Sequence, residues 1–520
     1  MSSRPVLSRP VLSRREFTLG GLLLAAGLAA GACGGPSGSP AANGTLRIGQ
    51  YWPPTSLDPA KAGGESQLFL QPAYDPLIHR AADGSYQPGL ATAWRYLGTG
   101  NKAFEITLRD GVTFGDGSPL TADGLKASIE HFRRSAGQAA AFLAPIDTMT
   151  PQGRLVLRLA LSEPHPLLPS LFTQDFLAGY VISPAGLATP AELATRTFGA
   201  GPYVLLPAET VANDHYTYGP DPKYWNSSGR FYDKITIKVL PNENTALAAL
   251  KTAQVDVVAG SYTIADGAKA AGFEVTSSPA IVMGLQLNDR AGTLCPPLAD
   301  VRVRQALNHA VDRVKITTAL LGEYGIPVDQ PSAPGEDGYS ERPFYTHDPG
   351  KARQLLAEAG LTGGFTLPVV VPSTPAFPGD LAQAIASDLQ QVGVTLRITA
   401  KEPASANTAL TQFPASSMGW GVLPAYFMGR GLWLRDAIGM NPFHSSDPEL
   451  ERLDQAAAAA DAQARTALDK QIIRRVVELG WFLPVCLSPG MLFYRDTVGV
   501  DPVPGKPFPS VTAWHPAGRA

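Results

Sequence analysis

The chain has 520 residues, of which 44% are hydrophobic and 17% are charged, and its formal net charge is −3. This composition excludes a disordered chain, and the near-neutral charge without runs of Lys and Arg argues against nucleic acid as a partner. No internal stretch reaches the roughly 18 uninterrupted apolar residues of a membrane-spanning helix. At about 150 residues per domain, the length predicts a large soluble protein with several α/β-type domains.

The N-terminal segment has the features of an export signal. Arg14 and Arg15 stand in a Ser-Arg-Arg-x-Phe-x-Leu frame, a short apolar segment follows at 19–32, and small residues precede Cys33. A basic region, a short apolar region and small residues before a cleavage site are typical of secretory signals. The arginine pair resembles the twin-arginine export signal, and the residues around Cys33 resemble a lipobox, in which the cysteine is acylated.

We therefore expect residues 1–32 to be a twin-arginine lipoprotein signal peptide, with a plain signal peptide and an incidental cysteine as the alternative. Residues 33–43 are rich in Gly, Ser, Pro and Ala, which is the composition of a flexible tether. The expected location is periplasmic or at the outer face of the cytoplasmic membrane, held there by the N-terminal lipid. Outside the cytoplasm Cys295 and Cys486 could form a disulfide or stay buried thiols, and the sequence leaves both open.

The first part of the chain beyond the tether alternates strands with turns. Apolar residues at period two predict strands at 45–49, 104–108, 155–161, 202–206 and 234–240. Thr121 is placed to cap a helix that carries Leu125, Ile129 and Phe132 on one face. A second short helix is expected at 245–250.

The chain beyond about residue 287 is richer in helices. N-cap residues and helical spacing predict helices after Asp300, after Asp348 and at 381–392. A glycine then leads into an alternating strand at 394–398, which is the order expected of α/β packing. A capping box at 446–449 opens an alanine-rich segment that we expect to be one long helix to about residue 479.

Several phrases of the sequence, taken in order, resemble the bacterial extracytoplasmic solute-binding proteins of family 5, the oligopeptide-, dipeptide- and nickel-binding proteins of ABC transporters. The phrases are PAYDPLI at 72–78, YQPGLA at 86–91, LRDGVTFGDGSPLTAD at 108–123, GAGPY at 199–203, YW at 224–225 and DVRVRQALNHAVDR at 300–313. Each phrase alone is weak, and most of them are turn and helix-cap chemistry. Their common order along the chain makes the resemblance specific.

The resemblance implies an α/β fold: a bilobed, periplasmic-binding-protein-like clamshell of type II with an extra domain, its two lobes joined by hinge strands. The implied domains are lobe I at 44–75, 198–286 and 486–520, the extra domain at 76–197, and lobe II at 287–485. The implied partners are a small-molecule or peptide ligand and ABC permease subunits with their ATPases. A monomer is expected.

The ligand is left open by the region around Trp420. Peptide-binding members commonly carry, soon after a tryptophan in lobe II, an aspartate that pairs with the ammonium group of the peptide, and here no acid lies between Trp420 and Asp436. A buried ammonium group without a carboxylate would be costly. The order Trp-Gly-x-x-Pro-x-Tyr is instead similar to the nickel-binding branch, which holds a metal–chelator complex.

That similarity implies a set of ligand-binding residues in lobe II, namely Trp420, Tyr426, Arg430 or Arg435, and His444. From the opposite lobe, Tyr51 and Trp52 could close on the same cleft. An arginine could clamp a carboxylate and the aromatic rings could stack on the ligand. The alternatives are core packing for the aromatic residues and a surface loop for His444.

The sequence lacks the spacing of a CxxC, HExxH, P-loop or GxSxG motif, so no catalytic residue, resident metal or cofactor is predicted. We expect a substrate-binding lipoprotein of an ABC importer, not an enzyme, that captures a peptide or similar small solute outside the cell and delivers it to a membrane permease. A metal chelate or another carboxylate-bearing solute is the alternative ligand. Two other readings are a sensor of the same fold and an exported hydrolase.

Overall fold

The computed structural model describes residues 44–135, 137–226, 230–373, 379–437, 440–501 and 509–518. These residues belong to one compact unit that begins at Asn43. The predicted signal peptide and lipidation site, with Arg14, Arg15 and Cys33, lie outside the described residues. Within the described ranges, no helix combines the length and apolar content needed to cross a membrane.

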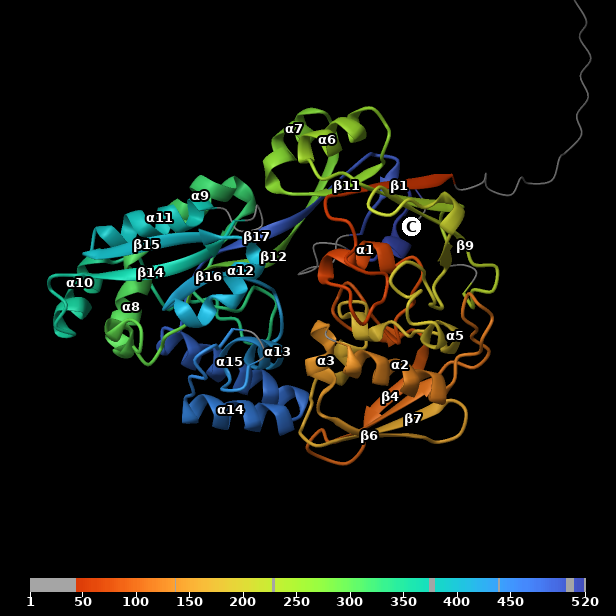
Figure 1. Ribbon diagram of the computed structural model, residues 1–520, viewed down its shortest axis with the longest axis horizontal. Helices are drawn as coiled ribbons and strands as arrows, with labels where there is room; N and C mark the ends of the chain where they lie inside the picture. The colour runs from red at the N-terminus through yellow and green to blue at the C-terminus, as the bar shows by residue number, and fades with distance from the viewer. Residues whose placement is uncertain are drawn as a thin grey trace, which may run out of the picture. The chain divides into compact units, whose positions relative to one another are not determined.

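A long mixed sheet runs through the unit (Figure 1). Its strand order is β15-β14-β16-β12-β17-β11-β1-β10-β9-β8, and the short β13 pairs with β17. The strands are β1 Thr45–Gln50, β8 Tyr203–Leu205, β9 His215–Pro220, β10 Lys234–Val239, β11 Val257–Gly260, β12 Glu274–Leu287, β13 Ile326–Pro327, β14 Phe365–Pro372, β15 Val394–Lys401, β16 Ala415–Gly421 and β17 Phe482–Tyr494. The alternating strands predicted near residues 45, 202, 234 and 394 are confirmed as β1, β8, β10 and β15.

Two long antiparallel strands, β12 and β17, join the two parts of this sheet. They pair from Glu274 opposite Tyr494 to Gln286 opposite Phe482. β17 borders β11 on one side, and β12 borders β16 on the other. One α/β part is therefore built on β1 and β8–β11, and a second on β14–β16. This is the clamshell architecture that the resemblance implies.

The N-terminal part of the sheet follows the predicted alternation. Leu46 and Ile48 of β1 are fully buried, and β1 pairs in parallel with both β10 and β11. Helices α6 Glu243–Lys251 and α7 Ala265–Ala270 pack beside these strands. Asn242 caps α6 by accepting a hydrogen bond from the amide of Thr245.

A separate antiparallel sheet, β4-β5-β7-β6, forms what we call the four-stranded subdomain. Its elements are β2 Ile78–Arg80, β3 Tyr86–Pro88, β4 Ala91–Tyr96, β5 Ala103–Leu108, α2 Ala122–Arg134, α3 Gln138–Leu143, β6 Ile146–Pro151, β7 Val156–Leu161, α4 Leu168–Leu171 and α5 Pro184–Ala188. The predicted cap of α2 is confirmed, because the Thr121 hydroxyl accepts a hydrogen bond from the amide of Gly124. Leu125, Ile129 and Phe132 form its buried face.

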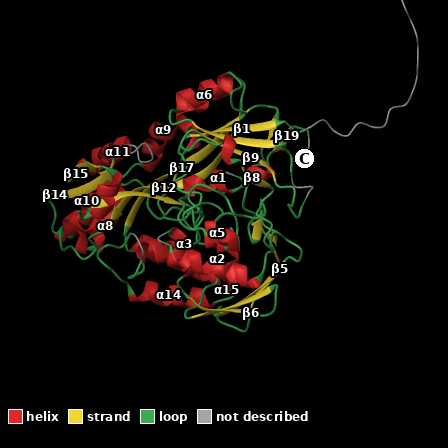
Figure 2. Ribbon diagram, turned by 45° about the vertical axis from the view of Figure 1, so that its right-hand side comes forward, coloured by secondary structure: helices red, strands yellow, loops and turns green. Residues whose placement is uncertain are grey.

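We call the elements from α8 to α15, with β13–β16, the C-terminal half. Its helices are α8 Val301–Ala310, α9 Arg313–Leu321, α10 Pro349–Glu358, α11 Gly379–Gln390, α12 Pro403–Thr408, α13 Ala425–Met428, α14 Pro448–Ala459 and α15 Ala462–Glu478. Figure 1 shows α8–α11 gathered around β14 and β15, and Figure 2 shows helices around the strands of the central sheet. Asp300 and Asp348 cap α8 and α10 as predicted.

The long helix expected to reach residue 479 is wrong in one respect, because it is two helices. Ala460 has an extended backbone conformation and ends α14. Asp461 then starts α15, and its carboxylate accepts a hydrogen bond from the amide of Ala464. The run of alanines favours a helix, but an aspartate that can cap favours a new N-terminus at this position.

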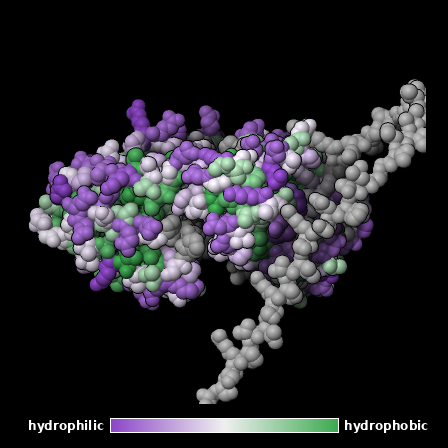
Figure 3. Space-filling view, turned by 90° about the horizontal axis from the view of Figure 1, so that it is seen from above, coloured by the Kyte–Doolittle hydropathy of each residue, from purple (hydrophilic) through white to green (hydrophobic). Residues whose placement is uncertain are grey.

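Cys295 and Cys486 are both buried and are free thiols, so the disulfide that the sequence left open is not formed. Burial raises the pKa of the Cys486 thiol to about 12. On the face seen in Figure 3, hydrophilic residues surround several apolar areas.

Candidate functional site

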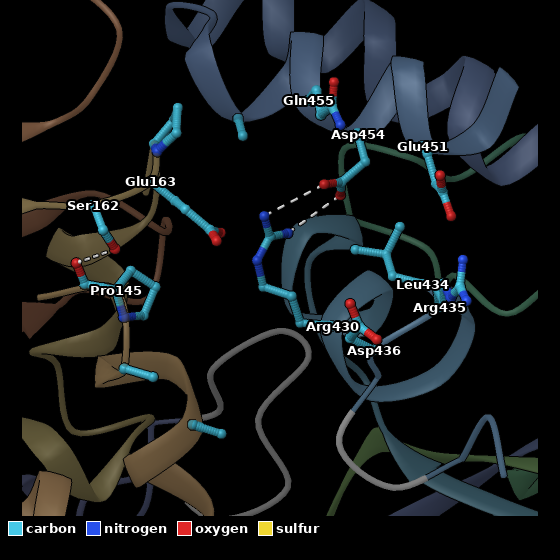
Figure 4. Close-up of a pocket in the computed structure, with 14 residues that line it drawn as sticks. Pro145, Ser162, Glu163, Arg430, Leu434, Arg435, Asp436, Glu451, Asp454 and Gln455 are labelled. Carbon is cyan, nitrogen blue, oxygen red and sulfur yellow. Dashed lines mark hydrogen bonds and ion pairs between the residues drawn. The ribbon is translucent and has the colours of Figure 1, made fainter. Parts of the chain in front are cut away.

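A cavity of about 830 Å³ lies between the four-stranded subdomain and the C-terminal half. One wall comes from α3 and the loop after β7, and the other from the residues after α13 and from α14 (Figure 4). Its polar and charged lining residues are Ser162, Glu163, Arg430, Arg435, Asp436, Glu451, Asp454 and Gln455.

A π-helical turn places Arg430 at this cavity. Pro424 precedes α13, and its carbonyl accepts hydrogen bonds from the amides of Phe427 and Met428. The chain then widens into a π-turn, labelled η9, over Gly429–Trp433, closed by the amide of Leu434 on the carbonyl of Gly429. π-Helical turns are rare in proteins, and those that do occur are often found at functional sites.

The guanidinium group of Arg430 is held by neighbours within the protein. Its Nη1 and Nη2 donate to the two carboxylate oxygens of Asp454 at 3.2 and 3.3 Å, and Nη1 also donates to the carbonyl oxygen of Tyr426 at 3.2 Å. The guanidinium carbon lies 3.5 Å from the centre of the Tyr426 ring. Asp454 therefore occupies the Nη1–Nη2 edge of Arg430, while the Nε–Nη2 edge has no carboxylate partner among the described residues.

Burial raises the pKa of Asp454, and the nearby charge of Arg430 acts against that rise. The carboxylate is 7% exposed, so the ion pair supplies the compensation that a buried charge requires. Arg430 and Asp454 thus act as one unit that forms part of the cavity wall.

Three other carboxylates reach the cavity and are not engaged in this way. Among the described residues, the side chains of Glu163, Asp436 and Glu451 make no hydrogen bond or ion pair, and Figure 4 shows Glu163 pointing into the gap that faces Arg430. Arg435 is the further cation in the lining. With Arg430 and Asp454 paired, the remaining groups give the cavity an excess of negative charge, which favours a cationic group on a ligand.

Tyr426, one of the predicted site residues, is buried next to this cavity. Its hydroxyl donates to the carbonyl oxygen of Pro164 at 3.3 Å, and its ring lies 4.8 Å from that of His165. Burial raises its pKa, so the hydroxyl stays protonated. Tyr426 and Arg430, both predicted as site residues, therefore contact each other, and Tyr426 also contacts the four-stranded subdomain.

Trp420 lies on β16 and is 9% exposed. Its ring packs edge-on against Phe482 with 5.1 Å between ring centres, and its Nε1 donates to the carbonyl oxygen of Pro331 at 3.4 Å. His444 is exposed, has a φ of 50°, and its Nδ1 lies 3.1 Å from the carbonyl oxygen of Arg435. Neither side chain lines the cavity.

Tyr51 and Trp52 follow β1, on the other side of the central sheet's long strands. Their rings meet edge to face at 4.5 Å, and Trp52 is 44% exposed. They also do not line the cavity beside Arg430. The predicted residues are therefore distributed among several places. Arg430 and Arg435 line the cavity and Tyr426 lies beside it, so three of the predicted residues lie together.

The sequence prediction omitted the acidic residues of the cavity. Asp454 carried a usable signal, because it falls on the face of α14 that also buries Leu450, Leu453 and Ala457. A charged residue on an apolar helix face needs a buried partner. Glu163 gave no such signal, because it lies in a loop. Only the folding of the chain brings it opposite the C-terminal half at the cavity.

No cluster of three or more His, Cys, Asp or Glu side chains suited to a metal ion is found among the described residues. The family description "Bacterial extracellular solute-binding proteins, family 5 Middle" matches residues 85–433, which is more than half of the chain. A probable peptide ABC transporter periplasmic-binding protein of Sinorhizobium fredii is 25% identical over 413 residues, covering 74% of this chain and 76% of that protein.

The nickel-binding periplasmic protein of Escherichia coli is 27% identical over 373 residues, covering 65% of this chain and 68% of that protein. Among solved structures, the periplasmic binding protein AgaA of A. tumefaciens R10 in complex with agropinic acid has a TM-score of 0.75 at 24% identity. That match covers 89% of this chain and 96% of AgaA and supports the same fold. The chain therefore belongs to family 5 of the bacterial extracellular solute-binding proteins.

Proposed function

We propose that this chain is the substrate-binding lipoprotein of an ABC importer and that it captures a short peptide or a similar small solute with a cationic end. The observation that carries the choice of ligand is the cavity with unengaged carboxylates of Glu163, Asp436 and Glu451. The solute would be bound, not chemically changed, and passed to a membrane permease with its ATPases. The peptide-transporter relative supports this ligand class.

The acidic groups answer the objection that the sequence raises against a peptide. No acid stands directly after Trp420, but carboxylates from the β7–α4 loop and from α14 face the cavity beside Arg430. When a closing cleft excludes water, an ammonium group needs a carboxylate partner to offset its desolvation. Arg435, which also lines the cavity, would pair with a carboxylate of the same ligand.

A metal chelate or another carboxylate-bearing solute is the second candidate. The observation in its favour is that Tyr426 and Arg430, which the nickel-binding branch implies, lie next to each other at the cavity. The pairing of Arg430 with Asp454 weighs against it, because the charge of that arginine is already balanced by a buried carboxylate on its Nη1–Nη2 edge.

The proposed domains are those that the sequence predicts. Lobe I comprises 44–75, 198–286 and 486–520, the extra domain 76–197, and lobe II 287–485. β12 and β17 would act as the hinge strands, since both pass from one part of the central sheet to the other. Closure of the lobes around a solute would signal the loaded state to the permease.

The location at the membrane is part of the same proposal. Arg14 and Arg15 would direct export of the folded chain, and acylated Cys33 would hold it at the outer face of the cytoplasmic membrane. Residues 33–43 would tether the binding unit to the lipid. A monomer suffices, because both walls of the cavity come from one chain.

The ligand class is tested by calorimetric titration with a pool of short random-sequence peptides and with the same pool N-acetylated. We expect acetylation, or Glu163→Gln, to weaken binding about 10- to 100-fold, as the loss of a charge-assisted hydrogen bond would. The matched control is Glu274→Gln, an exposed carboxylate on β12 that does not line the cavity. Equal binding of the free and acetylated pools would contradict a role for the ammonium group.

A further inference from the structure

Phe427 of α13 is inserted into the core of the four-stranded subdomain. It is fully buried, and its ring centre lies 4.8 Å from that of Phe142 and 4.7 Å from that of Phe176. The ring centre of His165 lies 6.0 Å from that of Phe427. We call the three rings of Phe142, His165 and Phe176 the Phe427 socket. Tyr426 and Phe427 therefore belong to the hydrophobic cluster of the subdomain, although they are part of the C-terminal half in sequence.

A stack of side chains continues from this socket toward α14. The His165 ring faces Tyr426, the Tyr426 ring carries the guanidinium group of Arg430, and Arg430 is paired with Asp454. Burial, helped by the charge of Arg430, lowers the pKa of His165 to about 3. The imidazole is therefore neutral at physiological pH and packs as an apolar ring.

A second contact lies at the C-terminal end of α14. The Asn101 side-chain amide donates to the carbonyl oxygens of Ala458 and Ala460, both at 2.9 Å. The last carbonyls of a helix have no partner within the helix, so this amide from the subdomain caps a helix of the C-terminal half. Asn101 has a φ of 54°, a conformation that asparagine tolerates better than most residues, and its carbonyl accepts the amide of His165.

We infer that the Phe427 socket and the Asn101 cap form a latch that holds the four-stranded subdomain against the C-terminal half without a bound solute. The Phe427 and Asn101 side chains lie beside the cavity and do not line it, so changing them acts on opening and leaves ligand contacts unchanged. The consequence for uptake rests on the proposed function, because a solute would enter and leave only while the latch is released. The latch itself is a property of the fold.

The latch is tested by energy transfer between fluorophores on Gln152→Cys in the subdomain and Lys470→Cys on α15, both exposed positions. The full chain also carries Cys33→Ser, and the buried Cys295 and Cys486 are protected from labelling. Asn101→Gly removes the side-chain amide and keeps the backbone conformation. Phe427→Leu replaces the inserted aromatic ring with a smaller side chain. The matched control is Asn213→Gly, at an asparagine with a φ of 63° before β9.

Without added solute, we expect Asn101→Gly and Phe427→Leu each to lower the transfer efficiency, and the double variant to lower it further. Asn213→Gly should match the parent chain. Circular dichroism identifies any variant that fails to fold. If Phe427→Leu does not fold, Asn101→Gly alone tests the latch. Transfer efficiency equal to that of the parent in Asn101→Gly would overturn the latch. The labelled chain is first unfolded, dialysed and refolded to remove co-purified solute, so this outcome is independent of whether the chain binds peptides.

Discussion

Buried charged side chains lie close to the interface between the subdomain and the C-terminal half. Asp454 is paired with Arg430 through two hydrogen bonds, whereas Asp469 on α15 is held less well. Asp469 is 2% exposed, its nearest cation atom is Arg465 Nε at 3.7 Å, and its Oδ1 has no hydrogen-bond partner. Burial raises the pKa of Asp469 to about 7, and the charge of Arg465 only partly opposes this.

Asp469 should make the stability of the chain depend on pH. The pKa of Asp469 in the folded chain is above the unfolded value of about 4. The stabilisation that the protonated side chain gives the folded state is therefore fully present below about pH 4 and is lost as the pH rises through about 7. We expect Asp469→Asn to gain stability relative to the parent chain, on the order of 2 kcal/mol, between about pH 5 and about pH 8. Urea unfolding at both pH values measures the difference, with the exposed Asp147→Asn as control. Parallel stability curves for Asp469→Asn and the parent would contradict the assignment.

At the scale of elements, strands with one exposed face were predictable and the two longest strands were not. Leu46 and Ile48 alternate with less buried residues in β1, which gives the period of two. The C-terminal end of β12 and much of β17 are buried on both faces, so their sequences show no alternation. Pro279 in β12 also argues against a central strand, and it stands at a shift in the β12–β17 register.

Gly284 permits the close pairing of β12 with β17. A Cβ atom at Gly284 would lie 2.1 Å from the carbonyl oxygen of Leu483, at a second shift in register. We expect Gly284→Ala to lower the free energy of unfolding by about 1–3 kcal/mol, the usual cost of overpacking. Urea unfolding checks this against Gly419→Ala on the adjacent β16, where the nearest atom to the new Cβ is Ile281 Cγ2 at 3.8 Å. Similar stability of the two variants would show that the strands can separate without cost.

At the scale of the whole molecule, the fold and the family could be predicted from ordered phrases, but the cavity could be predicted only in part. Tyr426 and Pro164, which meet through a hydrogen bond, are 262 positions apart in the chain. No local pattern connects a loop of the subdomain with α13, so the role of Glu163 could not be anticipated. Arg430 was predicted as a site residue, but its pairing with Asp454 depends on the packing of η9 against α14.

Native mass spectrometry of the chain purified from its host, compared with the same sample denatured, tests most directly whether the acid-lined cavity holds a short peptide or similar solute with a cationic end. We expect a series of bound peptide masses in the native spectrum that are lost on denaturation and reduced in Glu163→Gln. A single metal-containing mass, or an empty chain even after incubation with the peptide pool, would contradict the claim.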